Sequence, residues 1–339
     1  MLPIELAARP VVRACHVADD DLPSLRDRFL DRLRRVVPID AAFFAAADPD
    51  TLLFTFASAD EPLVRAGSSF LEHELADTED VNRFAALARA RRPVATLDRA
   101  TMGRRAASAR FREVIAPLGL GDELRVALRT RTTTWGFLCL HREGSFDDRD
   151  VAVLQHVAAH AAEAIRRIVA ASLTSATDGQ AGVILVAEER VIAITDASTI
   201  WLGADVKAGD PLPLSLRPVL RRLDAIENGT SSDLPAIRLV SSAGKLLEAN
   251  AARLRGDGRT VAITVGPATA RARSDVRLAA HDLTPAQRRV TSLVIQGRST
   301  KQIVAELQIG EHTVQDHLKA VFDKLGVASR RELVASLLR

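Results

Sequence analysis

A row of polar side chains near the C-terminal end could form hydrogen bonds to DNA bases. The stretch from Thr313 to Leu333 reads TVQDHLKAVFDKLGVASRREL. At about 100° per residue, an apolar stripe falls on one side of a helix, and its members are Val314, Leu318, Val321 and Leu325. The opposite side carries His312, Gln315, Asp316, Lys319 and Asp323. Gln and Lys can bond to base edges and Asp can accept from a cytosine amino group, so we expect this helix in a major groove.

Capping residues predict the elements that would hold this helix. Thr284-Pro285-Ala286-Gln287 and Ser299-Thr300-Lys301-Gln302 each place a capping hydroxyl three residues before a glutamine. Ser329-Arg330-Arg331-Glu332 repeats the pattern with a glutamate. Gly297 and Gly326 suit helix ends, and Gly310 suits a helix start. The sequence therefore predicts four short helices from Thr284 to the C-terminus.

The charge distribution agrees with a nucleic-acid partner. The whole chain has a net charge of +3, whereas the part from Leu283 onward has nine basic against five acidic side chains. The helix starts at Thr300 and Ser329, with Lys301, Arg330 and Arg331 beside them, suit backbone phosphates. The competing interpretation of the polar side is a solvated face on a small bundle.

The segment LTPAQRRVTSLVIQGRSTKQIVAELQIGEHTVQDHLKAVFDKLGVASRRELVASLL resembles the LuxR/FixJ-type helix-turn-helix over its whole length. The resemblance implies that Gln315, Asp316 and Lys319 enter the groove, while His312, Thr313 and the turn Ser299–Lys301 approach the backbone. Departures from the usual family residues occur at Gln287, Val304, Gly310 and Gln315, and we expect them to alter the affinity and the recognised sequence. We count Lys324, Arg330 and Arg331 with the DNA-binding set.

Specific binding by such a domain usually needs a two-fold dimer on double-stranded DNA, so we expect a homodimer. A stripe between Asp148 and Val169 has the spacing of a helix–helix seam, and its members are Val151, Leu154, Ala158, Ala161, Ile165 and Ile168. The same stripe also fits a helix that packs on its own domain. Both interpretations remain open at this stage.

Composition and length predict a multidomain protein of the cytoplasm. The 339 residues exceed one ordinary domain. No apolar stretch is long enough to cross a membrane, and the start of the sequence lacks the pattern of a secretion leader. Small polar residues at 171–182 and the basic segment 266–282 are interpreted as linkers. We predict an N-terminal helical segment (1–37), two sensor-like domains (38–170 and 180–268) and the DNA-binding domain (279–339).

The block at 38–170 resembles a GAF domain, an α+β fold that holds small ligands between a sheet and its covering loops. The resemblance is carried by IDAAFFAAAD at Ile39–Asp48, a predicted half-buried strand at Glu123–Thr130 and its partner TTTWGFLCLHRE. Candidate lining residues are Phe54, Phe56, Phe70, Trp135, Phe137 and Cys139, although aromatic side chains on strands also serve as ordinary core. The residue set of cyclic-nucleotide GAF domains is not evident, which disfavours that ligand.

The block at 180–268 resembles a PAS domain, also α+β, at GVILVAEERVIAITDASTIWLG and in two closing strands. Trp201 could stack on a ligand or belong to the core. We therefore predict a multidomain fold of two α+β sensors and an all-α four-helix domain. The function expected is transcriptional regulation by an unknown small-molecule effector.

Two rival functions remain open. Asp19, Asp20 and Asp21 could belong to a phosphorylated response regulator, although the rest of such a domain is missing. Cys139 could serve a redox sensor or an enzyme. No catalytic constellation or metal site is predicted, since His156 and His160 lack a third ligand. We expect no enzyme activity and no cofactor other than the effector.

Overall fold

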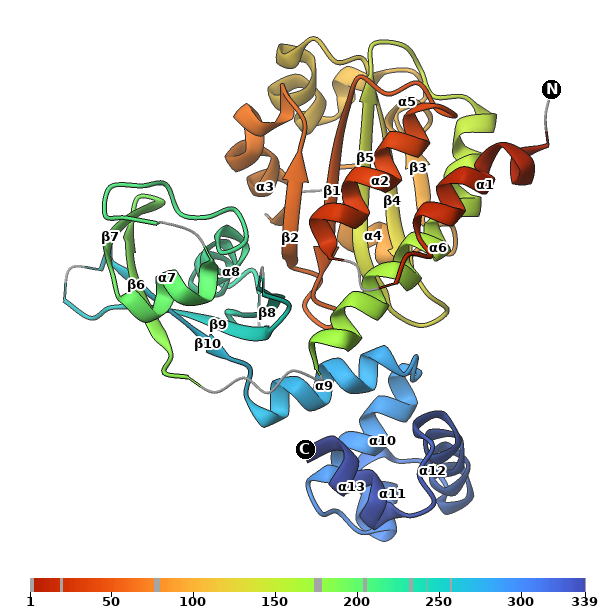
Figure 1. The fold of residues 1–339 in the computed structure, drawn as a ribbon, viewed down its shortest axis with the longest axis vertical. Coiled ribbons are helices and arrows are strands. Elements are labelled where there is room, and N and C mark those ends of the chain that lie inside the picture. The colour runs from red at the N-terminus through yellow and green to blue at the C-terminus, as the bar shows by residue number, and fades with distance from the viewer. Residues whose placement is uncertain are drawn as a thin grey trace.

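A computed structural model describes residues 3–18, 21–75, 80–173, 179–203, 206–231, 234–241, 243–256 and 258–338. Figure 1 shows an N-terminal part built on one sheet, a second sheet beside it, and a helical C-terminal part below. Within the described ranges, every helix is too short or too polar to span a bilayer.

The first sheet is antiparallel, with strand order β2-β1-β5-β4-β3. Its strands are β1 (Ala41–Ala47), β2 (Phe54–Ala59), β3 (Val94–Thr96), β4 (Asp122–Arg129) and β5 (Thr134–Arg142). One face packs on α1 (Ile4–Ala14), α2 (Leu22–Arg34) and α6 (Asp148–Ser172). The other lies under short elements, which are η1 (Leu63–Ala66), α3 (Gly67–Leu75), α4 (Phe84–Arg89), α5 (Leu97–Ala100), η2 (Arg105–Ala107), η3 (Phe111–Ile115) and η4 (Ala116–Leu118). The sheet is therefore covered on both faces.

Double coverage corrects the prediction of a half-buried strand at Glu123–Thr130. Strand β4 is buried on both faces. Its sequence alternates apolar residues with residues such as Arg125, a pattern that is typical of a strand with one face in solvent. The Arg125 guanidinium lies 2.6 Å from a carboxylate oxygen of Glu74, at the end of α3. Sequence alternation could not show that an ion pair from a distant helix allows this charge to be buried.

The apolar stripe of α6 could belong to a dimer contact or to the core of its own domain. Ala158, Ala161 and Ile165 are buried in the core shared with α1, α2 and the sheet. Of the two interpretations of this stripe, the structure favours a helix that packs on its own domain.

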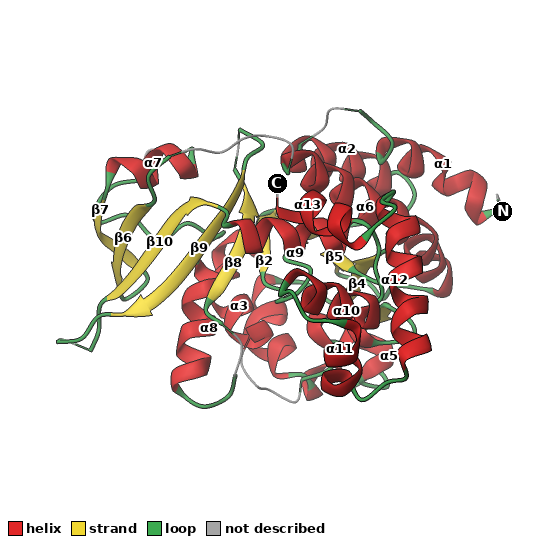
Figure 2. Cartoon of the chain, turned by 90° about the horizontal axis from the view of Figure 1, so that it is seen from below, coloured by secondary structure: helices red, strands yellow, loops and turns green. Residues whose placement is uncertain are grey.

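The second sheet has the order β7-β6-β10-β9-β8. Its strands are β6 (Gly182–Ala187), β7 (Arg190–Ile194), β8 (Ala236–Val240), β9 (Leu246–Arg253) and β10 (Val261–Pro267). In both sheets the first strand along the chain therefore lies between the second and the fifth. Two helices, α7 (Asp196–Leu202) and α8 (Arg217–Glu227), contribute to a core with the inward side chains of these strands. Figure 2 shows β6, β10 and β9 from below with α7 and α8 at their margins.

The C-terminal part contains α9 (Ala270–Ala280), α10 (Pro285–Ile295), α11 (Thr300–Leu307), α12 (Glu311–Leu325) and α13 (Arg330–Leu338). The four predicted helices are α10 to α13. Capping boxes at Thr284 and Ser299 start α10 and α11. Gly326 ends α12 with a φ of 65°, a conformation that costs glycine least.

Helix α9 corrects the interpretation of residues 266–282 as a linker. Thr269 caps α9 by accepting a hydrogen bond from the amide of Ala272. Val276 and Ala279 are buried in the core around α6. The sequence of α9 shows no clear helical periodicity, because alanines form much of its contact with the core around α6. Small residues allow close packing without a stripe of large apolar side chains.

Candidate functional site

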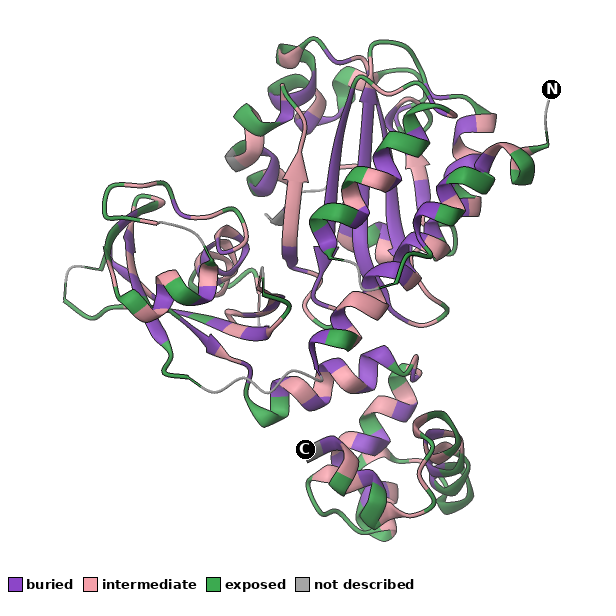
Figure 3. Ribbon diagram, in the orientation of Figure 1, coloured by how far each residue is buried: buried purple, intermediate pink, exposed green. Residues whose placement is uncertain are grey.

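The polar side of α12 is exposed, as its sequence pattern predicts. Val314, Leu318 and Val321 are buried against α10 and α11. The opposite side is exposed at His312, Thr313, Gln315, Asp316 and Lys319. Figure 3 shows this outer side of α12 in green, away from the two sheets. A straight helix with short and medium polar side chains fits the width of a major groove.

The turn before α11 gives a second part of this surface. The Ser299 hydroxyl accepts from the Gln302 amide at 3.3 Å, and Gln302 Oε1 accepts from the Ser299 amide at 2.8 Å. These bonds fix the first turn of α11, where Lys301 is exposed and Thr300 is half-buried. The open helix start and the lysine together favour an anion such as phosphate.

The remaining predicted DNA contacts differ in their surroundings. Lys324 donates to the main-chain oxygen of Asp282 at 2.8 Å and to Gln287 Oε1 at 3.0 Å. Arg330 donates to the main-chain oxygen of Arg298. Arg331 is exposed. Lys324 and Arg330 therefore stabilise the helical domain itself in this structure, whereas Lys319 points to solvent.

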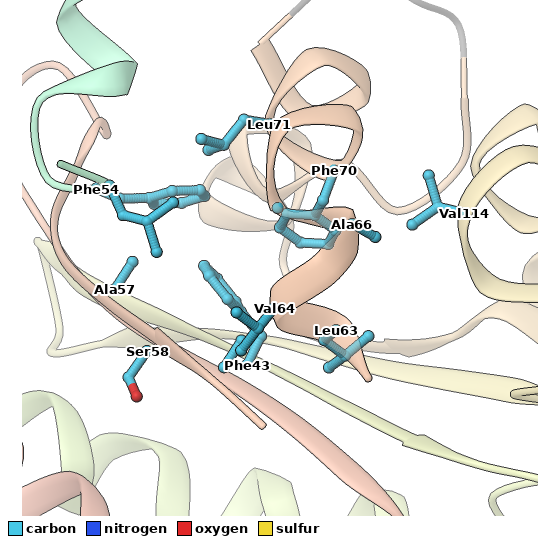
Figure 4. Close-up of a pocket in the computed structure, with 13 residues that line it drawn as sticks. Phe43, Phe54, Ala57, Ser58, Leu63, Val64, Ala66, Phe70, Leu71 and Val114 are labelled. Atoms are coloured by element: carbon cyan, nitrogen blue, oxygen red, sulfur yellow. The ribbon is translucent and has the colours of Figure 1, made fainter. Parts of the chain in front are cut away.

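A cleft beside the first sheet gathers two of the predicted ligand-lining residues. Phe54 and Phe70 line it together with Phe43, Ala57, Ser58, Ala59, Leu63, Val64, Ala66, Gly67, Leu71, Val114 and Leu214. We call this the sensor cleft. Figure 4 shows the phenyl rings of Phe43, Phe54 and Phe70 converging between the β1–β2 hairpin and α3. Phe43 was not among the predicted lining residues, because it is adjacent to Phe44 on one strand and alternation alone does not show which of the two faces the cleft.

The other predicted lining residues lie elsewhere. Phe137 packs behind the cleft and stacks on Phe84 with ring centroids 4.6 Å apart. Phe56 and Trp135 face the opposite side of the sheet, toward α2 and α6. A register shift in β2 places Phe56 and Phe54 on opposite faces of the sheet, and a register shift in β5 does the same for Trp135 and Phe137. Trp201 belongs to the core of the second sheet, and its Nε1 donates to the main-chain oxygen of Gln180 at 2.9 Å.

Cys139 belongs to a buried ionic cluster. Its Sγ lies 3.2 Å from Glu123 Oε1 and 3.1 Å from His141 Nε2. Glu123 also accepts from Arg110 at 2.7 Å and lies 3.0 Å from Arg125. Burial opposes ionisation of Glu123, but the two guanidinium groups outweigh it and hold the pKa of Glu123 well below its usual value.

The same cluster brings three possible metal ligands together, namely Glu123, Cys139 and His141. Two guanidinium groups already neutralise the carboxylate, and a dication placed beside them would be repelled. Burial, then the Glu123 charge, raises the pKa of the Cys139 thiol, which disfavours the thiolate that metals and oxidants need. We assign the cluster a structural role between the sheet and its covering helices.

Of the three aspartates considered for phosphorylation, Asp19 and Asp20 lie outside the described residues. Asp21 caps α2, and its Oδ1 accepts from the Ser24 amide at 2.7 Å. This bond lowers the pKa of Asp21 and gives it the role of a helix cap.

Polar contacts join the β1–β2 turn of the first sheet to the second sheet and to the helical domain. Arg238 on β8 donates to Asp48 Oδ2 at 2.7 Å and lies 2.7 Å from Asp50. Arg288 on α10 lies 3.1 Å from the other oxygen of Asp50. Burial acts to raise the pKa of Asp48, but the charge and hydrogen bonds of Arg238 outweigh it and lower that pKa. The β1–β2 turn therefore contacts both of the other parts of the chain.

A second joint lies at the β4–β5 turn. The hydroxyls of Thr130 and Thr132 donate to Asp282 Oδ1 at 2.9 and 2.5 Å. Asp282 is also the residue whose main-chain oxygen accepts from Lys324. Two hairpin turns of the first sheet thus fix the start of α10.

The helical domain and the first sheet each match a known protein family. Residues 281–337 match the model described as bacterial regulatory proteins, luxR family, and residues 21–165 match the GAF domain model. The spore germination protein GerE of Bacillus subtilis is 44% identical over 57 residues, which cover 17% of this chain and 77% of GerE. The chain therefore belongs to the luxR family of bacterial regulatory proteins and carries an N-terminal GAF domain.

Other similarities cover less. The putative HTH-type transcriptional regulator Mb0914c of Mycobacterium bovis is 50% identical over 52 residues, which are 15% of this chain and only 6% of that protein. The VqsR ligand-binding domain structure from Pseudomonas aeruginosa aligns with 14% identity and a TM-score of 0.32, over 48% of this chain and 94% of that one. That TM-score is too low to bear on function. The combination of a luxR-type domain and a GAF domain supports a DNA-binding transcriptional regulator modulated by a sensed signal.

Proposed function

We propose that this protein is a sequence-specific bacterial transcription factor whose DNA binding is set by a small-molecule effector. The observation that carries the proposal is the exposed polar side of α12, held outward by Val314, Leu318 and Val321 in the core. Gln315, Asp316 and Lys319 contact bases or phosphates, and the turn at Ser299–Lys301 holds the DNA backbone. The protein acts in the cytoplasm and is not an enzyme.

The DNA-bound form is a homodimer, because one helix-turn-helix reads half a site and two copies read half-sites about one helical turn apart. With the stripe of α6 buried, the dimer uses another surface. Effector binding favours one arrangement of the dimer over another by its differential affinity for the two.

The effector is sensed by the GAF domain or by the PAS-like domain at 180–268. Support for a second sensor of this kind is that its sheet repeats the strand order of the GAF sheet. Its helices α7 and α8 also contribute to one common core with the inward side chains of its strands.

Selection of bound fragments from the parent genome with the purified full-length protein tests the proposal. We expect recovered fragments to share a two-fold symmetric site with half-sites about one turn apart. Neighbouring genes would then indicate the effector class. Fragments that share no site, or a protein that ignores duplexes at low ionic strength, would contradict it.

A further inference from the structure

The sensor cleft has the chemistry of a binding site for an uncharged, apolar molecule. Among the described residues, its lining contains phenyl rings, aliphatic side chains and the hydroxyl of Ser58, and no charged side chain. A charged ligand would give up its hydration there and find no side chain of opposite charge. An apolar ligand would be stabilised, because binding removes its apolar surface from water. Building on the function proposed above, we infer that an uncharged apolar effector binds in the sensor cleft and that Leu214 of the second domain closes it.

The closed form is too small for such an effector. The cavity in the cleft measures about 40 Å³, little more than the space of a few water molecules. Leu214 lines it from the segment before α8, and a Cβ at Gly67 would lie 3.7 Å from Leu214 Cδ2. Leu214 and Val64 are nevertheless 38% and 48% exposed, so the closing contact is partial. An effector therefore enters by displacing Leu214, and it favours an arrangement in which the second domain has moved away from α3.

The β1–β2 hairpin connects this movement to the DNA-binding domain. Phe43 and Phe54 line the cleft from its two strands. The turn between them carries Asp48 and Asp50, which bind Arg238 of the second domain. Arg238 shares Asp50 with Arg288 of α10. Displacement of the second domain therefore removes Arg238 from the Asp50 carboxylate, which also binds Arg288 of α10. Asp50 is thus the residue that couples ligand binding in the cleft to the helical domain.

Fluorescence of N-phenyl-1-naphthylamine, an uncharged apolar probe, tests the site on the full-length protein. We expect saturable binding that 1-octanol reverses at a concentration at least tenfold lower than octanoate, because none of the described lining residues is a cation that could receive the carboxylate. Equal displacement by both compounds, or no probe binding by protein that still binds DNA, would overturn the inference.

Two pairs of variants locate the probe. Ala57→Trp fills the cleft and is expected to weaken probe binding at least tenfold, whereas Ala262→Trp, on β10 of the second sheet, leaves it unchanged. Leu214→Ala removes the closing side chain and strengthens binding at least threefold, whereas Leu234→Ala, at an exposed position of the same domain, has no effect. DNA binding by each variant shows that it is folded. Probe binding unaffected by Ala57→Trp would place the probe elsewhere and refute the site.

Hydrogen exchange tests the connection. We expect saturating 1-octanol to speed exchange in α10 at least threefold in the wild-type protein. In Asp50→Asn, which lacks one contact that holds the second domain, the same octanol binds at least as tightly as in the wild type but no longer changes exchange in α10. An identical response in Asp50→Asn would refute the role of this carboxylate. Loss of sequence-specific DNA binding with intact probe binding would instead contradict the proposed function.

Discussion

Lys324, near the end of α12, donates a 2.8 Å hydrogen bond to the main-chain oxygen of Asp282, just before α10. The side chain of Asp282 in turn accepts from Thr130 and Thr132 on the first sheet. Lys324, which we expected among the DNA contacts from the sequence, thus ties α12 to the first sheet. Two lysines of the same helix therefore differ in their contacts: Lys324 bonds to the main chain before α10, whereas Lys319 points to solvent.

Lys324→Met should loosen α12 without changing the salt dependence of DNA binding. The variant loses bonds to Asp282 and Gln287, and loss of a charged hydrogen bond costs about 1.5–3 kcal/mol. Amide hydrogen exchange in α12 should accelerate by at least tenfold. A fall in the slope of log affinity against log salt, with unchanged exchange, would show that Lys324 contacts phosphate instead.

Gly136→Ala should destabilise the GAF domain. An added Cβ would lie 2.4 Å from the main-chain oxygen of Ala45 and 2.8 Å from Ile165 Cδ1. Overpacking of this kind costs about 1–3 kcal/mol or more, which thermal unfolding would register. Gly144→Ala is the matched control, since a Cβ there meets nothing within 4 Å. Equal melting temperatures for both variants would contradict the close approach of β1, β5 and α6.

Stability should fall as the pH is lowered from about 7 to 4.5, partly through His141. Burial lowers the pKa of His141 to about 4, below the value of about 6.5 for an exposed histidine. The unfolded chain therefore binds a proton in this window that the folded chain does not, so acid favours unfolding. Urea unfolding of His141→Gln should show a weaker pH dependence between pH 6.5 and 4.5. An unchanged dependence would mean that the pKa of His141 is the same in the folded and the unfolded chain.

The Cys139 thiol should resist alkylation in the folded protein. It is fully buried, and its pKa is raised by burial and by Glu123. With iodoacetamide at pH 8, mass spectrometry should find Cys139 unmodified in the native protein and modified in urea. Rapid native modification coupled to altered DNA binding would support the redox sensor instead.

Sequence patterns were sufficient where local interactions decide the structure. The capping boxes at Thr284 and Ser299 involve residues three apart, so the starts of α10 and α11 were predictable. The apolar stripe of α12 could be predicted for the same reason, since residues three and four apart lie on one side of a helix.

Contacts between residues distant in sequence were not predictable. Arg125 is buried between Glu123 on its own strand and Glu74, and the second of these is 51 residues away. Leu214 enters the sensor cleft from another domain, and nothing in its neighbouring residues marks it. Register shifts in β2 and β5 turned Phe56 and Trp135 away from the cleft, although simple alternation places them beside Phe54 and Phe137.

Lys319 lies on the exposed side of α12 that we propose binds DNA. The most direct test of this proposal is the binding of Lys319→Ala to a genomic fragment selected by the wild-type protein, titrated across a range of salt concentrations. We expect affinity to fall by about 1–3 kcal/mol if Lys319 bonds a base, or the salt slope to decrease by about one if it contacts phosphate. Lys207→Ala, in the second domain, should bind like the wild type. Wild-type affinity together with a wild-type slope for Lys319→Ala would contradict the assignment of this side of α12 to DNA.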